Sequence, residues 1–415
     1  MHGPDPAVLA REAMMALTVV IVAAKLGGEF FSRLGQPPVL GELVIGMALG
    51  NLPWFLALKT STAIAVVAEI GVILLLFEVG LESDLHKMLA VGWSALLVAC
   101  LGVVAPMALG YGVSALLLSQ EGPLTHLFVG ATLTATSVGI TARVLKDLNV
   151  ADTKEARIIL GAAVADDVIG LVVLAVVSGL AAATAGSGAG FTWSSTLWIV
   201  AKAALFLTLA MLAGRFLAQR MFRYAARLRI PGVLAAVSIC FCFVTAMLAA
   251  RVGLAPIVGA FAAGLVLDPV HYQPFLDRGE RRVEDLLFPI TTLIAPVFFV
   301  LMGLRVDLSG FASAPVAAFT ALVTLAAVAG KQICALGVLE RGVDRLAVGV
   351  GMIPRGEVGL IFASIGAGLV VAGRPLFSTA TLSALVAMVM LTTLVTPPLL
   401  KVVFVRRAKD RGVVV

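Results

Sequence analysis

Charged residues are scarce in this chain. Asp, Glu, Lys and Arg make up 13% of its 415 residues, whereas hydrophobic residues make up 60% and the mean hydropathy is +1.08. A soluble domain has about 25% charged residues, so the composition excludes a soluble globular protein. No hydrophilic stretch is long enough for a separate domain, and we expect no nucleotide-binding or soluble regulatory domain. The chain instead contains apolar runs of about 20 residues, the length that crosses a hydrocarbon core of about 30 Å.

Cysteine is also rare. The four cysteines all fall inside apolar runs, which excludes a disulfide framework. Cys240 and Cys242 are two positions apart and would point away from each other on a helix, which argues against a metal pair. We therefore interpret Cys100, Cys240, Cys242 and Cys334 as small buried hydrophobic residues.

The apolar runs predict an all-α polytopic membrane protein with thirteen membrane-spanning segments. We expect these segments at residues 14–31, 39–58, 62–81, 90–118, 127–142, 158–183, 196–217, 232–250, 254–267, 286–303, 316–339, 346–370 and 376–405.

The net charge of +6 does not indicate a nucleic-acid partner, because the basic residues lie in short loops between apolar runs. Two basic clusters, after the seventh and the last segments, fall on one side of the bilayer if there are thirteen crossings. The positive-inside rule makes that side the cytoplasm. We therefore expect the N-terminus outside and the C-terminus in the cytoplasm. The basic residues of the two clusters are Arg215, Arg220, Arg223, Arg227 and Arg229, then Lys401, Arg406, Arg407, Lys409 and Arg411.

The two halves of the sequence resemble each other. Residues 38–46 match 256–264, residues 80–85 match 303–308, and residues 137–140 match 357–360, at offsets of 218, 223 and 220 residues. Three matches in order predict two six-helix repeats, at 1–185 and 231–415, joined by a linker helix and a basic loop at 186–230. An odd linker helix inverts the second repeat, and inverted repeats are typical of secondary transporters.

The fifth segment of each repeat is interrupted near its middle. Hydroxyl residues and glycine interrupt residues 132–139, and Gly, Pro and charged residues interrupt 351–359. Such interruptions at corresponding positions indicate two discontinuous helices that unwind at a binding site. The alternative is two ordinary helices kinked at Pro or Gly.

Two adjacent aspartates, Asp166 and Asp167, lie inside an apolar segment. A carboxylate at the bilayer centre costs ~2.5–3.5 kcal/mol on insertion scales, so an ionisable residue there usually marks an ion or proton pathway. Asp166 follows Arg157 by nine residues and Lys331 precedes Glu340 by nine, so both reach a depth of about 14 Å from the cytoplasmic side. Adjacent residues diverge by about 100° on a helix. One aspartate can therefore pair with Lys331 while the other faces a cavity; the alternative is a purely structural charge cluster.

Further charges lie in apolar segments. Arg355 and Glu357, in the second interrupted segment, could brace the structure or compensate exposed helix ends. Glu78 lies deep in its segment, and its role stays open.

Five stretches together resemble a known family. They are ATLTATSVGITARVL (131–145), RIILGAAVADDVIG (157–170), LAPIVGAFAAG (254–264), Gly330-Lys331 and GMIPRGEVGLI (351–361). They are similar to the NapA-type bacterial sodium/proton antiporters, within the second monovalent cation:proton antiporter family. The resemblance implies a homodimer in the bacterial plasma membrane, with two crossing broken helices in each protomer. It also implies a core domain of helices 4–6 and 11–13 that moves against a dimerisation domain of helices 1–3 and 8–10.

The resemblance further implies roles for individual residues. Asp167 corresponds to the carboxylate that carries the cation and the proton, and Asp166 to the one that bonds to Lys331. Thr134 and Ser137 fall in the unwound part of the first broken helix and could help hold the ion. The implied activity is electrogenic, elevator-type exchange of cytoplasmic Na⁺ or Li⁺ for external H⁺, with no cofactor beyond the transported ions.

Three other functions stand as alternatives to sodium/proton exchange. Related potassium-efflux proteins carry Gln-Asp in place of Asp-Asp, so the Asp166-Asp167 pair favours the sodium type over a K⁺/H⁺ antiporter. A cation channel or a sensor could use the same fold. An intramembrane aspartic protease needs carboxylates on two facing helices, whereas Asp166 and Asp167 are neighbours, so we do not expect an enzyme.

Overall fold

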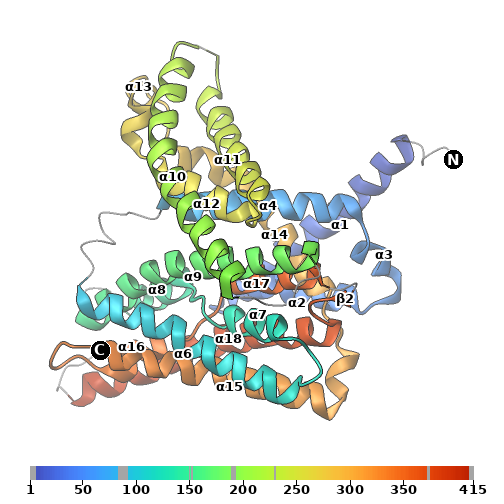
Figure 1. Cartoon of the computed structure of the whole chain (residues 1–415), viewed down its shortest axis with the longest axis vertical. Coiled ribbons are helices and arrows are strands. Elements are labelled where there is room, and N and C mark those ends of the chain that lie inside the picture. Colours follow the sequence, from blue (N-terminus) through green and yellow to red (C-terminus); the bar gives the residue numbers. More distant parts are fainter. Residues whose placement is uncertain are drawn as a thin grey trace. The chain divides into compact units, whose positions relative to one another are not determined.

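A computed structural model describes residues 6–82, 92–148, 150, 153–187, 193–228, 230–371 and 374–410 (Figure 1). In these ranges eight helices are long and apolar enough to cross a membrane, and three shorter apolar helices accompany them. The prediction of a predominantly helical, polytopic membrane protein is therefore confirmed. The count of thirteen crossings stays a prediction.

The chain forms two compact units, each of which takes helices from both halves of the sequence. The first unit comprises Met1–Asp84, Ser178–Ala183 and Ala189–Val306; the second comprises Leu85–Val177, Thr184–Gly188 and Asp307–Val415. The units therefore differ from the sequence repeats 1–185 and 231–415, because helices pack with partners far away in the chain.

The first unit depends on glycines where helices cross. A Cβ on Gly46 of α2 would lie 2.3 Å from the Val300 carbonyl oxygen of α14, and one on Gly264 of α12 would lie 2.2 Å from that of Phe77 in α4. Small residues let helix backbones approach this closely, which is how helices associate in membranes. The helices of this unit are α1 Pro6–Arg33, α2 Pro38–Gly50, η1 Pro53–Phe55, α3 Leu56–Lys59, α4 Thr62–Glu82, α10 Trp193–Ala225, α11 Val233–Arg251, α12 Pro256–Val266, η2 Pro269–Tyr272, α13 Gln273–Leu276 and α14 Val283–Leu304.

The second unit packs α15 against α6 at a similar close crossing. A Cβ on Gly330 of α15 would lie 2.6 Å from the Cα atom of Pro106 in α6. The elements of this unit are α6 Trp93–Leu117, α7 Pro123–Thr132, α8 Val138–Asp147, α9 Lys154–Ser187 (whose residues 178–183 cluster with the first unit), η3 Ser309–Ala312, α15 Ala314–Cys334, η4 Ala335–Gly337, α16 Arg345–Gly351, α17 Glu357–Gly368, β1 Val370–Val371, β2 Arg374–Pro375 and α18 Thr379–Asp410.

Two sequence-based expectations need correction. The segment expected at 39–58 ends as a helix at Gly50, because Asn51 leaves the helical conformation and Pro53 begins a separate turn. Cys100 and Cys240 are exposed, and only Cys242 and Cys334 are buried. Apolar surroundings in the sequence do not distinguish a helix face that meets lipid from one that meets protein.

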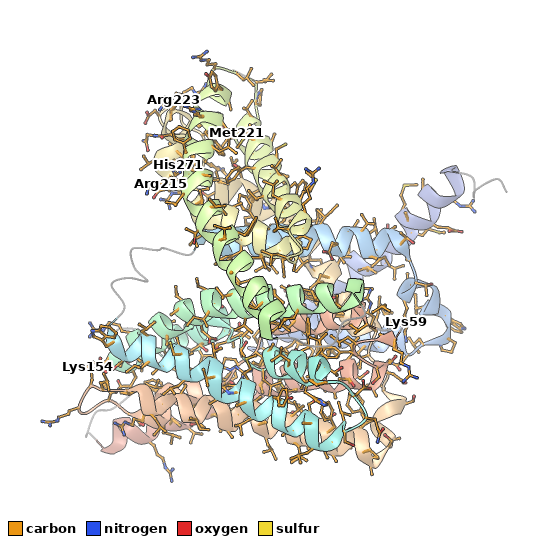
Figure 2. All side chains as sticks on the ribbon, in the orientation of Figure 1. Lys59, Lys154, Arg215, Met221, Arg223 and His271 are labelled. Carbon is orange, nitrogen blue, oxygen red and sulfur yellow. The ribbon has the colours of Figure 1, made fainter. Side chains whose placement is uncertain are left out.

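His271 forms a reciprocal cap at the start of η2. The Asp268 side chain accepts from the Val270 N–H at 3.0 Å, and the Asp268 N–H donates to Nδ1 of His271 at 3.0 Å. A ring nitrogen that accepts a hydrogen bond carries no proton. Burial lowers the pKa of His271, Asp268 partly opposes this, and Arg215 adds to it; Figure 2 shows Arg215 beside the histidine.

From the environment of His271 we predict that the protein loses stability in acid. Because the folded-state pKa of His271 lies below that of the unfolded chain, the unfolded chain takes up a proton first as the pH falls. We expect the melting temperature of the wild type to fall between pH 7.5 and pH 5.5. The decrease should be smaller in His271→Asn, because asparagine keeps a hydrogen-bond acceptor but does not titrate. Equal decreases in both proteins, measured by thermal unfolding in one detergent, would contradict this role.

Candidate functional site

The two interrupted segments contact each other at their breaks. The first break, residues 133–137, separates α7 from α8, and the second, residues 352–356, separates α16 from α17. The Ser137 N–H donates to the Pro354 carbonyl at 2.8 Å, and the Thr141 hydroxyl donates to the Gly351 carbonyl at 2.7 Å. Helix ends leave backbone groups unsatisfied, and these two bonds satisfy some of them in a segment where water is scarce. The structure thus has breaks at both positions that the sequence indicated.

Arg355 braces the two breaks from within. Its side chain is completely buried, and its guanidinium donates to the carbonyls of Ala135 at 3.0 Å and Ala327 at 3.2 Å. Its own carbonyl accepts a short hydrogen bond from the Thr393 hydroxyl of α18. Arg355 therefore links the first break, α15 and α18, and its charge also interacts with that of Asp166. The bracing role that the sequence left open is the one these contacts support.

Asp166 and Lys331 form a buried ion pair between α9 and α15. Both side chains are completely buried, and Nζ of Lys331 lies 3.3 Å from each carboxylate oxygen of Asp166. Charge-assisted pairs are usually about 2.7–2.9 Å long, so this one is loose. A Cβ on Gly102 of α6 would lie 3.1 Å from Nζ, so the glycine leaves room for the ammonium group.

Asp167 has a different environment from its neighbour. Its side chain is partly exposed, while that of Asp166 is fully buried. Successive residues diverge around a helix, so the two carboxylates of α9 face different surroundings. Asp166 is thus paired with a cation of the protein and fully buried, whereas part of the surface of Asp167 stays exposed.

The remaining predicted site residues lie in or beside the breaks. Thr134 and Ser137 are both buried in the first break, and the Thr134 hydroxyl donates to the Ala131 carbonyl at 2.8 Å. Its oxygen lone pairs stay available as acceptors. Glu357 begins α17, but its side chain lies outside what the structure describes. Reasoning from the sequence missed Thr141 and Thr393, whose only signal is a hydroxyl in an apolar segment.

The contact between the breaks leaves no room at Gly356. A Cβ there would lie 2.7 Å from both Cβ and Oγ of Ser137, which forces the two breaks apart. We expect Gly356→Ala to lower the melting temperature by several degrees, and Ser137→Gly to restore most of the loss in the double variant. Gly359→Ala is the matched control, because its Cβ would meet nothing closer than 3.5 Å. Equal melting temperatures for the two alanine variants would show that the breaks do not pack as described.

Known proteins resemble this chain over nearly its whole length. The family described as "sodium/hydrogen exchanger, transmembrane" matches residues 16–405. This chain belongs to that family. The chain is 36% identical to the high-affinity Na⁺/H⁺ antiporter NhaS3 of Synechocystis, over 98% of this chain and 93% of that protein. It is 33% identical to the Na⁺/H⁺-K⁺ antiporter GerN of Bacillus cereus, over 97% of this chain and 98% of that protein.

A solved structure shares the fold of this chain. The sodium/proton antiporter MjNhaP1 from Methanocaldococcus jannaschii superposes with a TM-score of 0.70, covering 94% of this chain and 96% of that one. The two sequences are only 15% identical, so this likeness supports the fold alone.

Proposed function

We propose that this protein is a secondary antiporter that exchanges cytoplasmic Na⁺ or Li⁺ for external H⁺ at Asp167. The observation that carries the proposal is the pairing of Asp166 with Lys331, both fully buried, next to the partly exposed carboxylate of Asp167. Membership in the exchanger family and the Na⁺/H⁺ antiporters among its relatives support it.

Competition for one carboxylate couples the two ions. A carboxylate that holds either a proton or Na⁺, but not both, releases one when it binds the other. Na⁺ is a hard cation, as Mg²⁺ and Ca²⁺ are, and such ions take oxygen ligands. In this proposal Asp167 is the principal ligand, Asp166 lies next to it, and hydroxyl or carbonyl oxygens at Thr134 and Ser137 complete the site.

The break in each crossing helix prepares this site. Unwound backbone is tolerated at membrane depth only where protein buries it or water lines it, and here Arg355 and Ser137 satisfy part of it. Carbonyls freed from helix bonding can bind a cation. Arg355 thus holds the two breaks in their conformation, and we assign it no contact with the ion.

The larger architecture belongs to the same proposal. Thirteen crossings in two inverted repeats place the N-terminus outside and the C-terminus in the cytoplasm. The second unit is the moving core of an elevator and the first unit is the dimerisation domain of a homodimer in the bacterial plasma membrane. Exchange follows when the loaded core moves and opens Asp167 to the other side.

Exchange in proteoliposomes tests the activity itself. The purified protein is reconstituted with a pH-sensitive dye inside, and Na⁺, Li⁺ or K⁺ gradients are imposed in turn. We expect Na⁺ and Li⁺ gradients to drive saturable proton movement, and K⁺ to do so weakly. If K⁺ drives proton movement best, the protein prefers K⁺ and the proposed preference for Na⁺ and Li⁺ is wrong. The relative GerN is named for both Na⁺ and K⁺. Non-saturable cation flux without proton movement would indicate a channel instead.

A further inference from the structure

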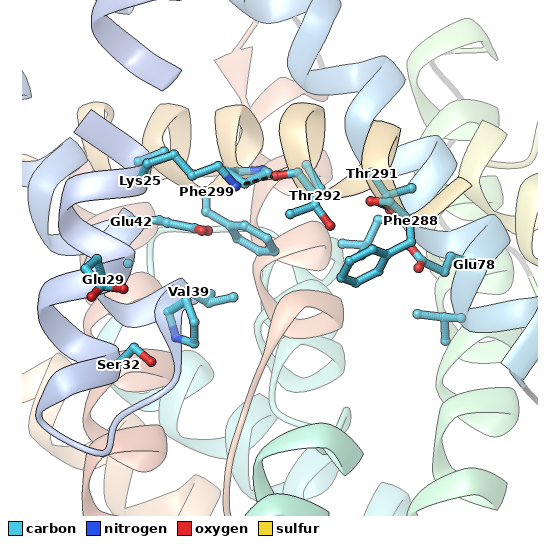
Figure 3. A pocket seen from close by; sticks show the side chains of 17 residues that line it. Lys25, Glu29, Ser32, Val39, Glu42, Glu78, Phe288, Thr291, Thr292 and Phe299 are labelled. Atoms are coloured by element: carbon cyan, nitrogen blue, oxygen red, sulfur yellow. Dashed lines mark hydrogen bonds between the residues drawn. The ribbon is translucent and has the colours of Figure 1, made fainter. Parts of the chain in front are cut away.

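The first unit contains a cavity of about 510 Å³ between α1, α2, α4 and α14 (Figure 3). All its lining residues belong to the first unit, whereas Asp166, Asp167 and Lys331 belong to the second. Ligand pockets for small molecules span about 300–1,000 Å³. The cavity is therefore large enough for an organic molecule, and the proposed transport site does not use it.

Glu42 is the polar group that the cavity leaves unsatisfied. Its side chain is only 7% exposed, it lines the cavity, and its Oε2 atom has no hydrogen-bond partner. A buried acceptor without a partner destabilises the fold, and it does so more when it is charged. Gly28 faces this carboxylate: a Cβ there would lie 3.6 Å from Oε1. Because glycine has no side chain, it leaves space beside the carboxylate.

Lys25, the basic residue that interacts electrostatically with Glu42, does not form a hydrogen bond with its Oε2 atom. Lys25 lines the same cavity and attracts Glu42 electrostatically. Its Nζ, however, donates to the carbonyl of Thr292 at 2.8 Å, as Figure 3 shows. The attraction therefore acts at longer range, and the Oε2 atom stays available for another donor.

The cavity carries more acidic than basic side chains. Glu29 at its edge is paired with Arg33 at 2.8 Å. Within the part of the chain that the structure describes, neither Glu42 nor Glu78 forms an ion pair, and both line the cavity with Lys25 as its one basic side chain. A cation bound in this cavity would favour the ionised form of these carboxyl groups.

The walls between the carboxylates favour an organic cation over a metal ion. In Figure 3, Glu42 and Glu78 lie on opposite sides of the cavity, and Phe299 and Phe288 lie between them. Aromatic faces attract ammonium groups and pack against apolar chains. Among the described residues no group of three His, Cys, Asp or Glu side chains could hold a metal ion.

We propose that this cavity binds an organic cation with a primary ammonium group and an apolar body. The ammonium group donates to Oε2 of Glu42, and the apolar body lies along Phe299 and Phe288 towards Glu78. A free alkylamine and the head group of an aminophospholipid share this chemistry.

Titration calorimetry with hexylammonium chloride tests the site on the detergent-purified full chain. We expect saturable binding to the wild type, and binding about tenfold weaker or worse to Glu42→Gln. Glu29→Gln is the matched control, because Glu29 lines the same cavity but is already paired; its affinity should stay within about twofold of the wild type. Asp167→Asn should also bind normally, which separates this cavity from the proposed transport site.

Three results would overturn the proposal. They are an unchanged affinity in Glu42→Gln, a lack of binding to the wild type, and equal affinity for the neutral analogue 1-hexanol. If Glu42→Gln does not purify as a single species, Val39→Phe fills the cavity while keeping the carboxylate, and it should abolish binding. Retained binding in that variant would equally overturn the site.

Nanodiscs distinguish the two sources of the ammonium group. If an aminophospholipid occupies the cavity, hexylammonium should bind several-fold more weakly in phosphatidylethanolamine than in phosphatidylcholine nanodiscs. If a free amine is the occupant, the two affinities should agree. Loss of binding in both lipids would contradict the proposal.

Discussion

Asp167→Asn is expected to abolish cation-driven proton movement in proteoliposomes. Asparagine has nearly the same shape but can neither take up the proton nor offer a charged ligand, so the exchange loses the group for which both ions compete. Asp167 is partly exposed and asparagine has nearly the same shape, so the substitution should shift the melting temperature by no more than a few degrees. Transport should fall to the level of protein-free liposomes.

A matched control shows that the loss is specific. Asp285 is an exposed carboxylate in the first turn of α14, and Asp285→Asn should transport as the wild type does. Gel filtration and thermal unfolding are the measurements that check whether both variants are folded. Exchange by Asp167→Asn at near the wild-type rate would remove Asp167 as the carrier.

Lys331→Gln is expected to change both the stability and the charge balance of transport. The substitution leaves Asp166 fully buried without the cation that lies 3.3 Å from it. Breaking a buried pair by removing one partner costs about 3–5 kcal/mol. The double variant Asp166→Asn/Lys331→Gln has no unpaired charge at this pair, so it should recover much of the loss in melting temperature.

The change in transport follows from counting charges. If Lys331 releases a proton when the cation binds and Asp167 releases another, two protons exchange for one cation and net charge moves. Glutamine cannot release the proton of Lys331, so the variant should exchange one proton per cation. Its rate should then be the same with and without an imposed membrane potential, whereas the wild-type rate should change. A wild-type voltage response in Lys331→Gln would mean that the lysine only tethers Asp166.

The sequence predicts the buried pair and the helix breaks for identifiable reasons. Charges in apolar segments are rare enough that Asp166 and Lys331, at equal depth, are natural partners. Gly, Pro and hydroxyl residues disfavour continuous helix, so the breaks fall where those residues gather. Both features depend on local composition and on helix rise, which a sequence displays directly.

Contacts between segments far apart in the sequence are harder to predict from it. The bonds from Arg355 to Ala135 and Ala327 end on backbone carbonyls, and any residue type supplies a carbonyl. The cavity beside Glu42 depends on how four helices leave space between them. In the sequence Glu42 is only one of several acidic residues in the first repeat, and nothing marks its Oε2 atom as unsatisfied.

Competition between Na⁺ and H⁺ at one carboxylate is the central claim, and the pH dependence of the apparent Na⁺ affinity tests it most directly. Initial exchange rates are measured over a range of Na⁺ concentrations at several pH values in proteoliposomes. Strict competition predicts that the apparent KM for Na⁺ rises about tenfold per pH unit in acid, while the maximal rate at saturating Na⁺ is unchanged. A maximal rate that falls with acidity at constant KM would show that proton and cation bind at separate groups, and would contradict the account.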